Sequence, residues 1–269
     1  MSARVRIGTQ GWTYPDWVGP LFPDGTRSPQ HLQLYSRAFD TVEVDSTFYA
    51  IPAVSTFESW RDRTPDGFVF SLKLPREITH DRRLVGGREP FAIFVERCRV
   101  LGEKLGPLLI QLGPDFGPGE DPALREFLAL LPADLRFAVE FRQSGWITAD
   151  THALLSDHGV ALALSEGQWI PRRWVLSLVE RPTATFHYIR WMGMDREITD
   201  FSRIQVDREA ELEEWAAAIR GAGEAVGEVF AYFNNYFAGH APASARSLQR
   251  LLGLEVVAPE RVGDQISLF

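Results

Sequence analysis

Short apolar segments alternate with amphipathic segments along the whole chain. The apolar segments are rich in β-branched and aromatic residues and are bounded by polar or Gly/Pro positions, which is typical of β-strands. Eight segments of this kind are predicted to be strands: Val5–Gly11, Thr41–Phe48, Phe68–Leu74, Pro107–Leu112, Phe137–Arg142, Val160–Ser165, Thr185–Trp191 and Glu228–Asn234. Each precedes a segment with helical spacing of apolar positions: Ser28–Ala38, Ser55–Asp62, Pro90–Gly102, Asp121–Leu130, Ala149–His158, Pro171–Ser177, Asp207–Arg220 and Ala241–Leu252.

This alternation predicts parallel βαβ units. Eight units in 269 residues match a single α/β domain of the (β/α)8 TIM-type barrel, which typically takes about 250 residues. A doubly wound open sheet is the alternative, but no Gly-rich dinucleotide-binding motif follows the first strand. We expect a barrel over residues 1–253 and a short irregular tail over 254–269.

Period-two alternation assigns strand side chains to the barrel interior or to the helix-facing side. In the second strand, Val42 and Val44 face the helices, so Thr41, Glu43 and Asp45 point inward. The same argument directs two further sets inward, one from the third strand and one from the fifth: Val69, Ser71, Lys73 and Ala138, Glu140, Arg142.

Polar residues gather at the carboxyl ends of the strands, where TIM barrels hold their active sites. They are Gln10, Glu43, Asp45, Lys73, Gln111, Glu140, Arg142, Arg190, Asn234 and Asn235. One interpretation is a functional site. The other is a set of paired ions that fills the top of the barrel, because an unpaired buried charge is very costly.

Within such a site, Glu43, Glu140 and Lys73 are the candidates for proton transfer. Lys73 would become a base if it were desolvated among cations, and would stay a charged positioning group if it paired with Glu43 or Asp45. The guanidinium fork of arginine suits phosphate or carboxylate oxygens, which makes three arginines candidates for anion binding: Arg76, Arg142 and Arg190.

The loop after the third strand is basic and contains Arg76, His80, Arg82 and Arg83. It could contribute to an anion site, or it could be a solvated loop whose arginines pair with Glu77 and Asp81 in the same segment.

Aromatic residues near the strand ends, with Tyr49 and Trp146 as candidates, could stack on a sugar or base, or could simply plug the barrel end.

Composition narrows the classes of function. Lys and Arg total 28 and Asp and Glu 36, which gives a formal charge of −8. This balance disfavours extensive phosphate-backbone binding but allows a local basic cleft. No apolar run approaches the roughly 18 residues of a membrane span, so we expect a soluble, cytoplasmic protein.

The single cysteine, Cys98, excludes intramolecular disulfides and cysteine zinc sites. The histidines show no metal-ligand spacing, and we expect no metal and no cofactor. A hard-metal set of Glu43, Asp45, Glu140 and His187 is the alternative, but alternation places His187 on the face opposite Arg190.

Six stretches together resemble the domain-of-unknown-function family 72, also called the YecE-like family. They are Ile7–Trp17, Val42–Tyr49, Phe70–His80, Leu105–Leu112, Val139–Arg142 with Trp146, and Tyr232–Asn235. The resemblance implies a TIM-type barrel and no particular reaction. The chain departs from the family pattern at Asp45, Gln143, Met192 and Tyr236, where many members have Asn, His, His and Asp. The two missing histidines leave Glu43, Glu140 and Lys73 as candidates for proton transfer.

Two functions remain open. The first is an enzyme, a hydrolase or a lyase, that performs acid–base or hydrolytic chemistry on an anionic substrate such as a phosphate-bearing sugar or nucleic-acid fragment. The second is a non-catalytic DNA-transaction module recruited to a sliding clamp through its tail.

The last five residues, Gln265-Ile266-Ser267-Leu268-Phe269, are similar to the short peptides by which bacterial replication and repair proteins dock on the DNA sliding clamp. Gln265 would make polar contacts while Leu268 and Phe269 enter an apolar groove. Alternatively, the tail folds back and buries both apolar side chains against its own barrel.

Clamp docking predicts that deletion of residues 265–269 abolishes binding to the cognate sliding clamp, because the two apolar anchors are lost. Titration calorimetry with the full-length and truncated chains measures this. Equal affinities for the two chains, or no binding by the full-length chain, would contradict the hypothesis.

Overall fold

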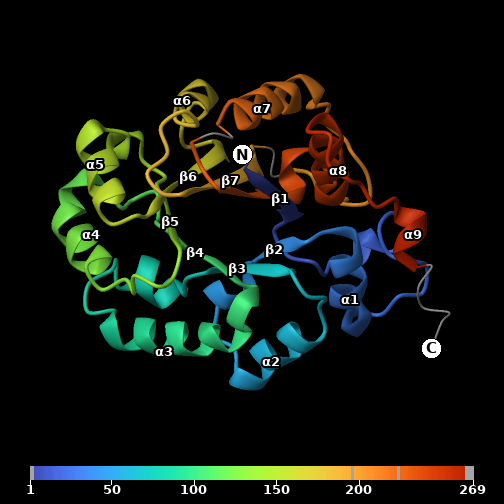
Figure 1. The fold of residues 1–269 in the computed structure, drawn as a ribbon, viewed down its shortest axis with the longest axis horizontal. Helices are drawn as coiled ribbons and strands as arrows, with labels where there is room; N and C mark the ends of the chain where they lie inside the picture. Colours follow the sequence, from blue (N-terminus) through green and yellow to red (C-terminus); the bar gives the residue numbers. More distant parts are fainter. Residues whose placement is uncertain (1–2, 195–196, 223–224, 264–269) are drawn as a thin grey trace.

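Eight parallel strands form a nearly closed barrel at the centre of the molecule (Figure 1). This computed structural model describes residues 3–194, 197–222 and 225–263. The hydrogen-bonded strand order is β1-β8-β7-β6-β5-β4-β3-β2, as expected for a TIM-type barrel. The strands are β1 (Arg4–Thr9), β2 (Thr41–Val44), β3 (Val69–Lys73), β4 (Leu105–Gln111), β5 (Phe137–Glu140), β6 (Ala161–Gly167), β7 (Phe186–Gly193) and β8 (Glu228–Phe233).

Helices surround the barrel, and at least one follows each strand (Figure 1). They are α1 (Ser28–Ala38), α2 (Val54–Asp62), α3 (Arg88–Cys98), α4 (Asp121–Leu128), α5 (Ala149–Asp157), α6 (Arg172–Ser177), α7 (Glu209–Ala222) and α8 (Ala241–Leu251). The predicted barrel and its eight βα units are therefore confirmed. None of the helices in the described ranges is both long enough and apolar enough to span a membrane.

Alternation along the strands separates an inner cluster of apolar side chains from a larger outer one. Val69, Leu109, Ala138 and Tyr188 belong to the inner cluster, whereas Val139 packs with the outer one. The inward assignments of Val69 and Ala138 are thus confirmed. Small residues on β5 and β6 leave room inside the barrel for the rings of Phe186, Tyr188, Phe230 and Tyr232.

A tyrosine hydroxyl joins the two strands that close the barrel. The fully buried Tyr35 on α1 accepts a hydrogen bond from the Thr9 amide (2.9 Å) and donates one to the Thr41 carbonyl (3.0 Å). It therefore replaces a direct bond between β1 and β2. Gly8 makes this approach possible, because a Cβ there would collide with the Thr41 carbonyl. Nearer the carboxyl ends, the Gly11 amide donates directly to the Glu43 carbonyl (2.8 Å).

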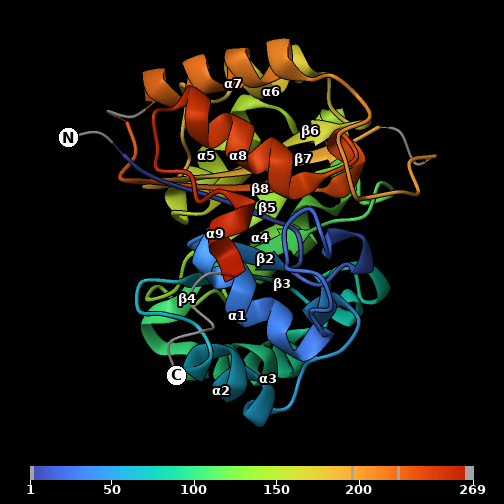
Figure 2. The ribbon, with the colours of Figure 1, turned by 90° about the vertical axis from the view of Figure 1, so that its right-hand side faces the viewer.

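The predicted tail begins with a short helix, α9 (Pro259–Gly263), which lies beside α1 (Figure 2). Val262 is fully buried, and its carbonyl accepts a hydrogen bond from Arg37 at 3.2 Å. Burial of the apolar side chain of Val262 stabilises the packing of α9 against the barrel domain. The predicted clamp-docking residues Gln265, Leu268 and Phe269 lie outside the described residues.

Tyr35→Phe keeps the ring but removes the bridging hydroxyl, which leaves the Thr9 amide and the Thr41 carbonyl without their partner. We expect a loss of about 1–3 kcal/mol in the free energy of unfolding, measured by urea denaturation. Tyr49→Phe is the control, because Tyr49 is 81% exposed, and should change stability by less than about 0.5 kcal/mol. Equal stabilities of wild type and Tyr35→Phe would show that the bridge is dispensable.

Candidate functional site at the barrel mouth

A buried arginine connects three strands at the carboxyl end of the barrel. Arg190 on β7 donates to both oxygens of Glu43 on β2, from Nε to Oε2 (2.9 Å) and from Nη2 to Oε1 (2.7 Å). Its Nη1 donates to Glu140 on β5. All three side chains are at most 1% exposed. A fork-shaped cation between two carboxylates fixes the relative position of these strands, because each buried charge needs its partner.

The pKa values of the two carboxylates are shifted in opposite directions. Burial favours the neutral form of Glu140, but attraction to Arg190 and Arg142 outweighs it and holds its pKa at about 2. Arg142 Nε donates to the remaining Glu140 oxygen at 3.2 Å. Burial raises the pKa of Glu43 against the attraction of Arg190. Glu140 is therefore ionised at neutral pH and cannot donate a proton there.

Lys73 lies next to this network, and its ammonium group makes longer contacts than those within the network. Its Nζ is 3.9 Å from Asp45 Oδ1 and 3.9 Å from the centroid of the Phe48 ring. Burial lowers its pKa, opposed mainly by Asp45. Asp45 Oδ1 is buried and accepts no hydrogen bond within the described residues. Asp45 Oδ1 thus lies 3.9 Å from both Lys73 Nζ and Arg190 Nη2, next to the opening of the barrel.

Neutral polar side chains border the same end of the barrel. Gln10 Oε1 accepts from Asn234 Nδ2 at 2.8 Å, and Gln10 Nε2 lies 3.0 Å from the sulfur of Met192. Gln111 is 2% exposed, and its Oε1 is buried with no hydrogen-bond partner among the described residues. These amides lie at or just after the carboxyl ends of β1, β4 and β8.

The basic loop after β3 pairs mostly with carboxylates. Arg76 donates to Asp81 (3.1 Å) and Arg82 to Glu77 (2.7 Å), as the solvated-loop alternative predicted. Arg83 pairs with two carboxylates on the next loop, those of Asp115 and Glu120. The charges of these arginines are therefore offset by carboxylates of the same and the next loop.

His80 belongs to the mouth through its ring, which contacts that of Phe48 with 5.0 Å between centroids. Its pKa is lowered, first by burial and then by the charges of Lys73 and Arg142. The imidazole is therefore mainly neutral at pH 7. Its Nδ1 shares a hydrogen bond with the Thr79 hydroxyl (2.9 Å), so Nε2 is the nitrogen that could meet a ligand.

Three predicted residues have other surroundings. Asn235 Oδ1 accepts from the amide of Ala241 at the start of α8 (2.9 Å). The indole of Trp146 stacks on Phe141 and donates to the carbonyl of Phe116 (2.9 Å), so it packs outside the barrel. Tyr49 is on the surface.

Tyr188 and Trp169 were missing from the predicted site. Tyr188 donates to Glu43 Oε2 at 2.7 Å, and its place two residues before Arg190 on the same strand could have signalled this. Trp169 follows β6, and the guanidinium of Arg142 lies 5.6 Å from the centroid of its ring. No spacing rule marks a loop tryptophan of this kind.

Metal-ligand geometry is absent from the described ranges, where no three His, Cys, Asp or Glu side chains lie close enough to share an ion. Tyr188 is in the inner cluster, which confirms that His187, its neighbour on β7, faces the opposite side.

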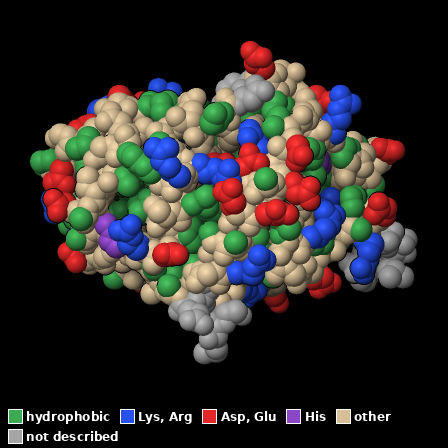
Figure 3. Space-filling model, turned by 90° about the horizontal axis from the view of Figure 1, so that it is seen from above, with side chains coloured by type: hydrophobic (Ala, Val, Ile, Leu, Met, Phe, Trp, Pro, Cys, Tyr) green, Lys and Arg blue, Asp and Glu red, His purple; other side chains and the backbone are tan. Residues whose placement is uncertain are grey.

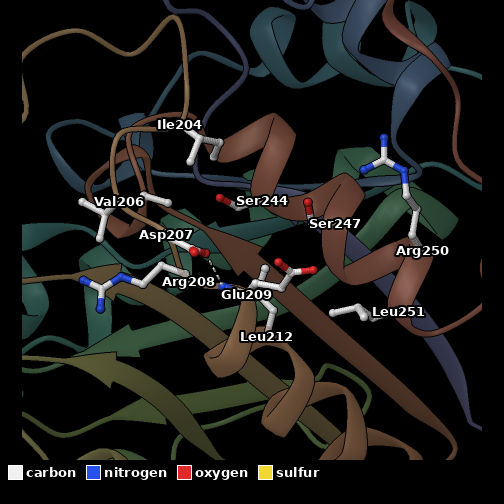
Figure 4. Close-up of a pocket in the computed structure, with 11 residues that line it drawn as sticks. Ile204, Val206, Asp207, Arg208, Glu209, Leu212, Ser244, Ser247, Arg250 and Leu251 are labelled. Carbon is white, nitrogen blue, oxygen red and sulfur yellow. Dashed lines mark hydrogen bonds between the residues drawn. The ribbon is translucent and has the colours of Figure 1, made fainter.

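A separate cavity of about 330 Å³ lies outside the barrel, between α7 and α8 (Figure 4). Ser244, Ser247 and Arg250 of α8 line one side, and Asp207 accepts a hydrogen bond from the Glu209 amide (3.0 Å) on the other. None of the residues predicted from the sequence for the site lines it.

Comparison with known proteins places this arrangement in a family. The sequence pattern described as "Protein of unknown function DUF72" matches residues 6–265. The chain belongs to the DUF72 family. UPF0759 protein YunF of Bacillus subtilis is 27% identical over 98% of this chain and 100% of its own length. UPF0759 protein YecE of Escherichia coli is 36% identical over 51% of this chain, a match that spans 48% of that protein.

Solved structures of DUF72 proteins share the fold. One from Thermotoga maritima has a TM-score of 0.79 at 24% identity and covers 93% of this chain and 99% of its own. One from Enterococcus faecalis has a TM-score of 0.74 at 19% identity, with 94% and 99% covered. These DUF72 structures confirm the barrel, and their names assign no reaction.

The depressed pKa of Glu140 predicts a pH-dependent cost for Glu140→Gln. Its ion pairs stabilise the fold fully above the ordinary pKa of 4.5, and this contribution is lost as pH falls from about 4.5 towards about 2. Urea denaturation should show the variant roughly 3–5 kcal/mol less stable than wild type at about pH 7, with a smaller difference at about pH 3.

Glu126→Gln provides the control, since Glu126 is exposed on α4 and should change stability little at either pH. A cost of Glu140→Gln that stays constant between the two pH values would contradict the assignment of an ionised, paired Glu140.

Proposed function

We propose that this protein is an enzyme that binds an anionic substrate at the barrel mouth and uses Lys73 for proton transfer. The observation that carries the proposal is the pair of Lys73 and Asp45, 3.9 Å apart above a fully paired ionic network. Phosphate-bearing sugars are the substrate class that we favour, because the mouth combines a cation with neutral amides.

The charges of the mouth support anion binding. Lys73 Nζ makes no hydrogen bond with the described residues and lies 3.9 Å from Asp45 Oδ1. Its three N–H groups can therefore be offered to a ligand. Arg142 is 19% exposed and contacts Glu140 through Nε. An ammonium and a guanidinium in a partly desolvated opening attract oxyanions more strongly than they would in water.

The same surroundings suit Lys73 for proton transfer. A lysine whose pKa is lowered by burial can release and recover a proton nearer neutrality than a solvated one. Asp45, whose Oδ1 accepts no hydrogen bond from the part of the chain that the structure describes, can orient the ammonium group or accept a hydrogen bond from a substrate hydroxyl.

Glu43 and Glu140 serve in this proposal as positioning residues. Both carboxylates are covered by their bonds to Arg190, so they act on the substrate through the position and charge of that guanidinium. They also offset its charge, which otherwise would dominate the mouth.

If the mouth binds anions, inorganic phosphate should bind the wild type. Lys73→Met should raise the dissociation constant at least about tenfold, which corresponds to about 1.4 kcal/mol of binding free energy. Titration calorimetry at low salt gives both dissociation constants. Arg82→Met is the control, because Arg82 is paired with Glu77, and should bind phosphate within about twofold of wild type. Equal binding by wild type and Lys73→Met would remove Lys73 from the site.

The lowered pKa of Lys73 makes phosphate binding pH-dependent. Affinity should fall as pH rises through a range below the ordinary lysine pKa of 10.5, because the neutral amine no longer attracts the anion. Lys73→Arg should keep its affinity over this range, since arginine stays charged. Identical pH profiles of the two proteins would contradict a titrating Lys73.

Salt dependence separates this proposal from the DNA-module alternative. A DNA-binding protein loses affinity steeply with salt in proportion to the phosphates contacted. The face that carries α6 and α7 shows acidic and basic side chains intermixed (Figure 3), and offers no continuous basic surface. Tight, salt-sensitive binding of a DNA duplex that Lys73→Met leaves unchanged would favour the alternative.

A further inference from the structure

A cavity of about 500 Å³ opens beside the barrel mouth, at the carboxyl ends of β6 and β7. Its lining includes Glu166, Trp169, Arg172, Arg208, Glu211 and Phe237. A β-bulge between Glu166 and Gly167 shifts the register of β6 against β7 at this point. The volume falls within the roughly 300–1,000 Å³ of small-molecule sites.

Charges in this cavity balance one another. Arg172 Nε lies 3.5 Å from Glu166 Oε2, and Arg208 Nη1 is 3.1 Å from Glu211 Oε1. The indole of Trp215 on α7 also donates to Glu166, and Arg172 reaches Glu214 of α7 at 2.7 Å, which joins α6 to α7. Both guanidiniums of the described lining are paired with carboxylates, so the cavity offers an ion no uncommitted cation and suits a neutral ligand better.

Trp169 supplies a large apolar face within this polar lining. It is 37% exposed, so part of its ring is accessible to a ligand. The carbon–hydrogen face of a sugar ring packs on an aromatic ring, while its hydroxyls donate to carboxylates and accept from guanidiniums. The lining of this cavity provides all three kinds of partner.

Arg142 connects the cavity with the barrel mouth. Its guanidinium lies 5.6 Å from the centroid of the Trp169 ring and donates to Glu140 in the central network. A ligand that packs on Trp169 would therefore lie next to Arg142, one of the two cations proposed to bind the anionic group of the substrate.

We propose that this cavity binds the neutral, polyhydroxylated ring of the substrate whose anionic group lies at the mouth, so that the substrate class is a sugar phosphate. This inference rests on the proposed function. Trp169 is its specificity-determining residue and Glu166 hydrogen-bonds the ring hydroxyls.

The test compares ribose 5-phosphate, glucose 6-phosphate and AMP with inorganic phosphate by titration calorimetry. In the wild type, at least one of the two sugar phosphates should bind about tenfold more tightly than phosphate. Trp169→Ala should remove most of this advantage and leave the affinity for phosphate unchanged. Trp174→Ala is the matched control, because Trp174 on α6 is 41% exposed and does not line the cavity, and should behave as wild type.

Three outcomes would overturn the inference: no gain for either sugar phosphate, a gain that survives in Trp169→Ala, or a gain for AMP alone, which would indicate a base rather than a sugar. Failure of the anion site is recognised separately. If wild type binds no phosphate but binds methyl β-glucoside in a Trp169-dependent manner, the proposed function fails and the sugar cavity stands.

Discussion

The guanidinium of Arg190 is the interaction on which the carboxyl end of this barrel depends. Arg190 is only 1% exposed, and its guanidinium bonds to Glu43 of β2 and Glu140 of β5. A cation this deep is tolerated only when charged and polar partners surround it. Tyr188 and Arg142 complete the set by bonding to the two carboxylates. The network therefore ties three strands to one geometry and offsets the charge that would otherwise fill the mouth.

This network determines which charged groups next to the opening are free of a direct hydrogen-bonded partner among the described residues. Because Glu43 and Glu140 are committed to Arg190, the charged pair next to the opening is Lys73 with Asp45. Burial makes the lysine easier to deprotonate. The rigid layer beneath, continued by the hydroxyl of Tyr232 between Thr41 and Ser71 (2.8 and 2.7 Å), supports the fixed geometry that a catalytic site requires.

Alternation was enough to predict the barrel and the faces of its strands, but not the ends of its elements. The second strand was predicted to reach Phe48 and ends at Val44. A 3-10 turn, Ser46–Phe48, follows the strand and is closed by the backbone bond from the Phe48 amide to the Asp45 carbonyl (3.1 Å). The Thr47 hydroxyl holds this turn by bonding to the carbonyls of Val44 (3.0 Å) and Lys73 (2.7 Å). Lys73 is far along the chain from Thr47, so no local pattern could reveal this bond. Similarly, alternation predicted that Glu43 and Glu140 point inward. Which cation each carboxylate meets depends on the stagger between neighbouring strands, which sets how deep in the barrel each side chain lies.

A crystal structure of the protein with phosphate at saturating concentration tests the account most directly. The account predicts phosphate oxygens within hydrogen-bond distance of Lys73 Nζ at the barrel mouth, with the bonds of Arg190 to Glu43 and Glu140 unchanged. Phosphate bound only elsewhere, for example between α7 and α8, or a mouth in which Arg190 leaves its carboxylates to hold the anion, would contradict it.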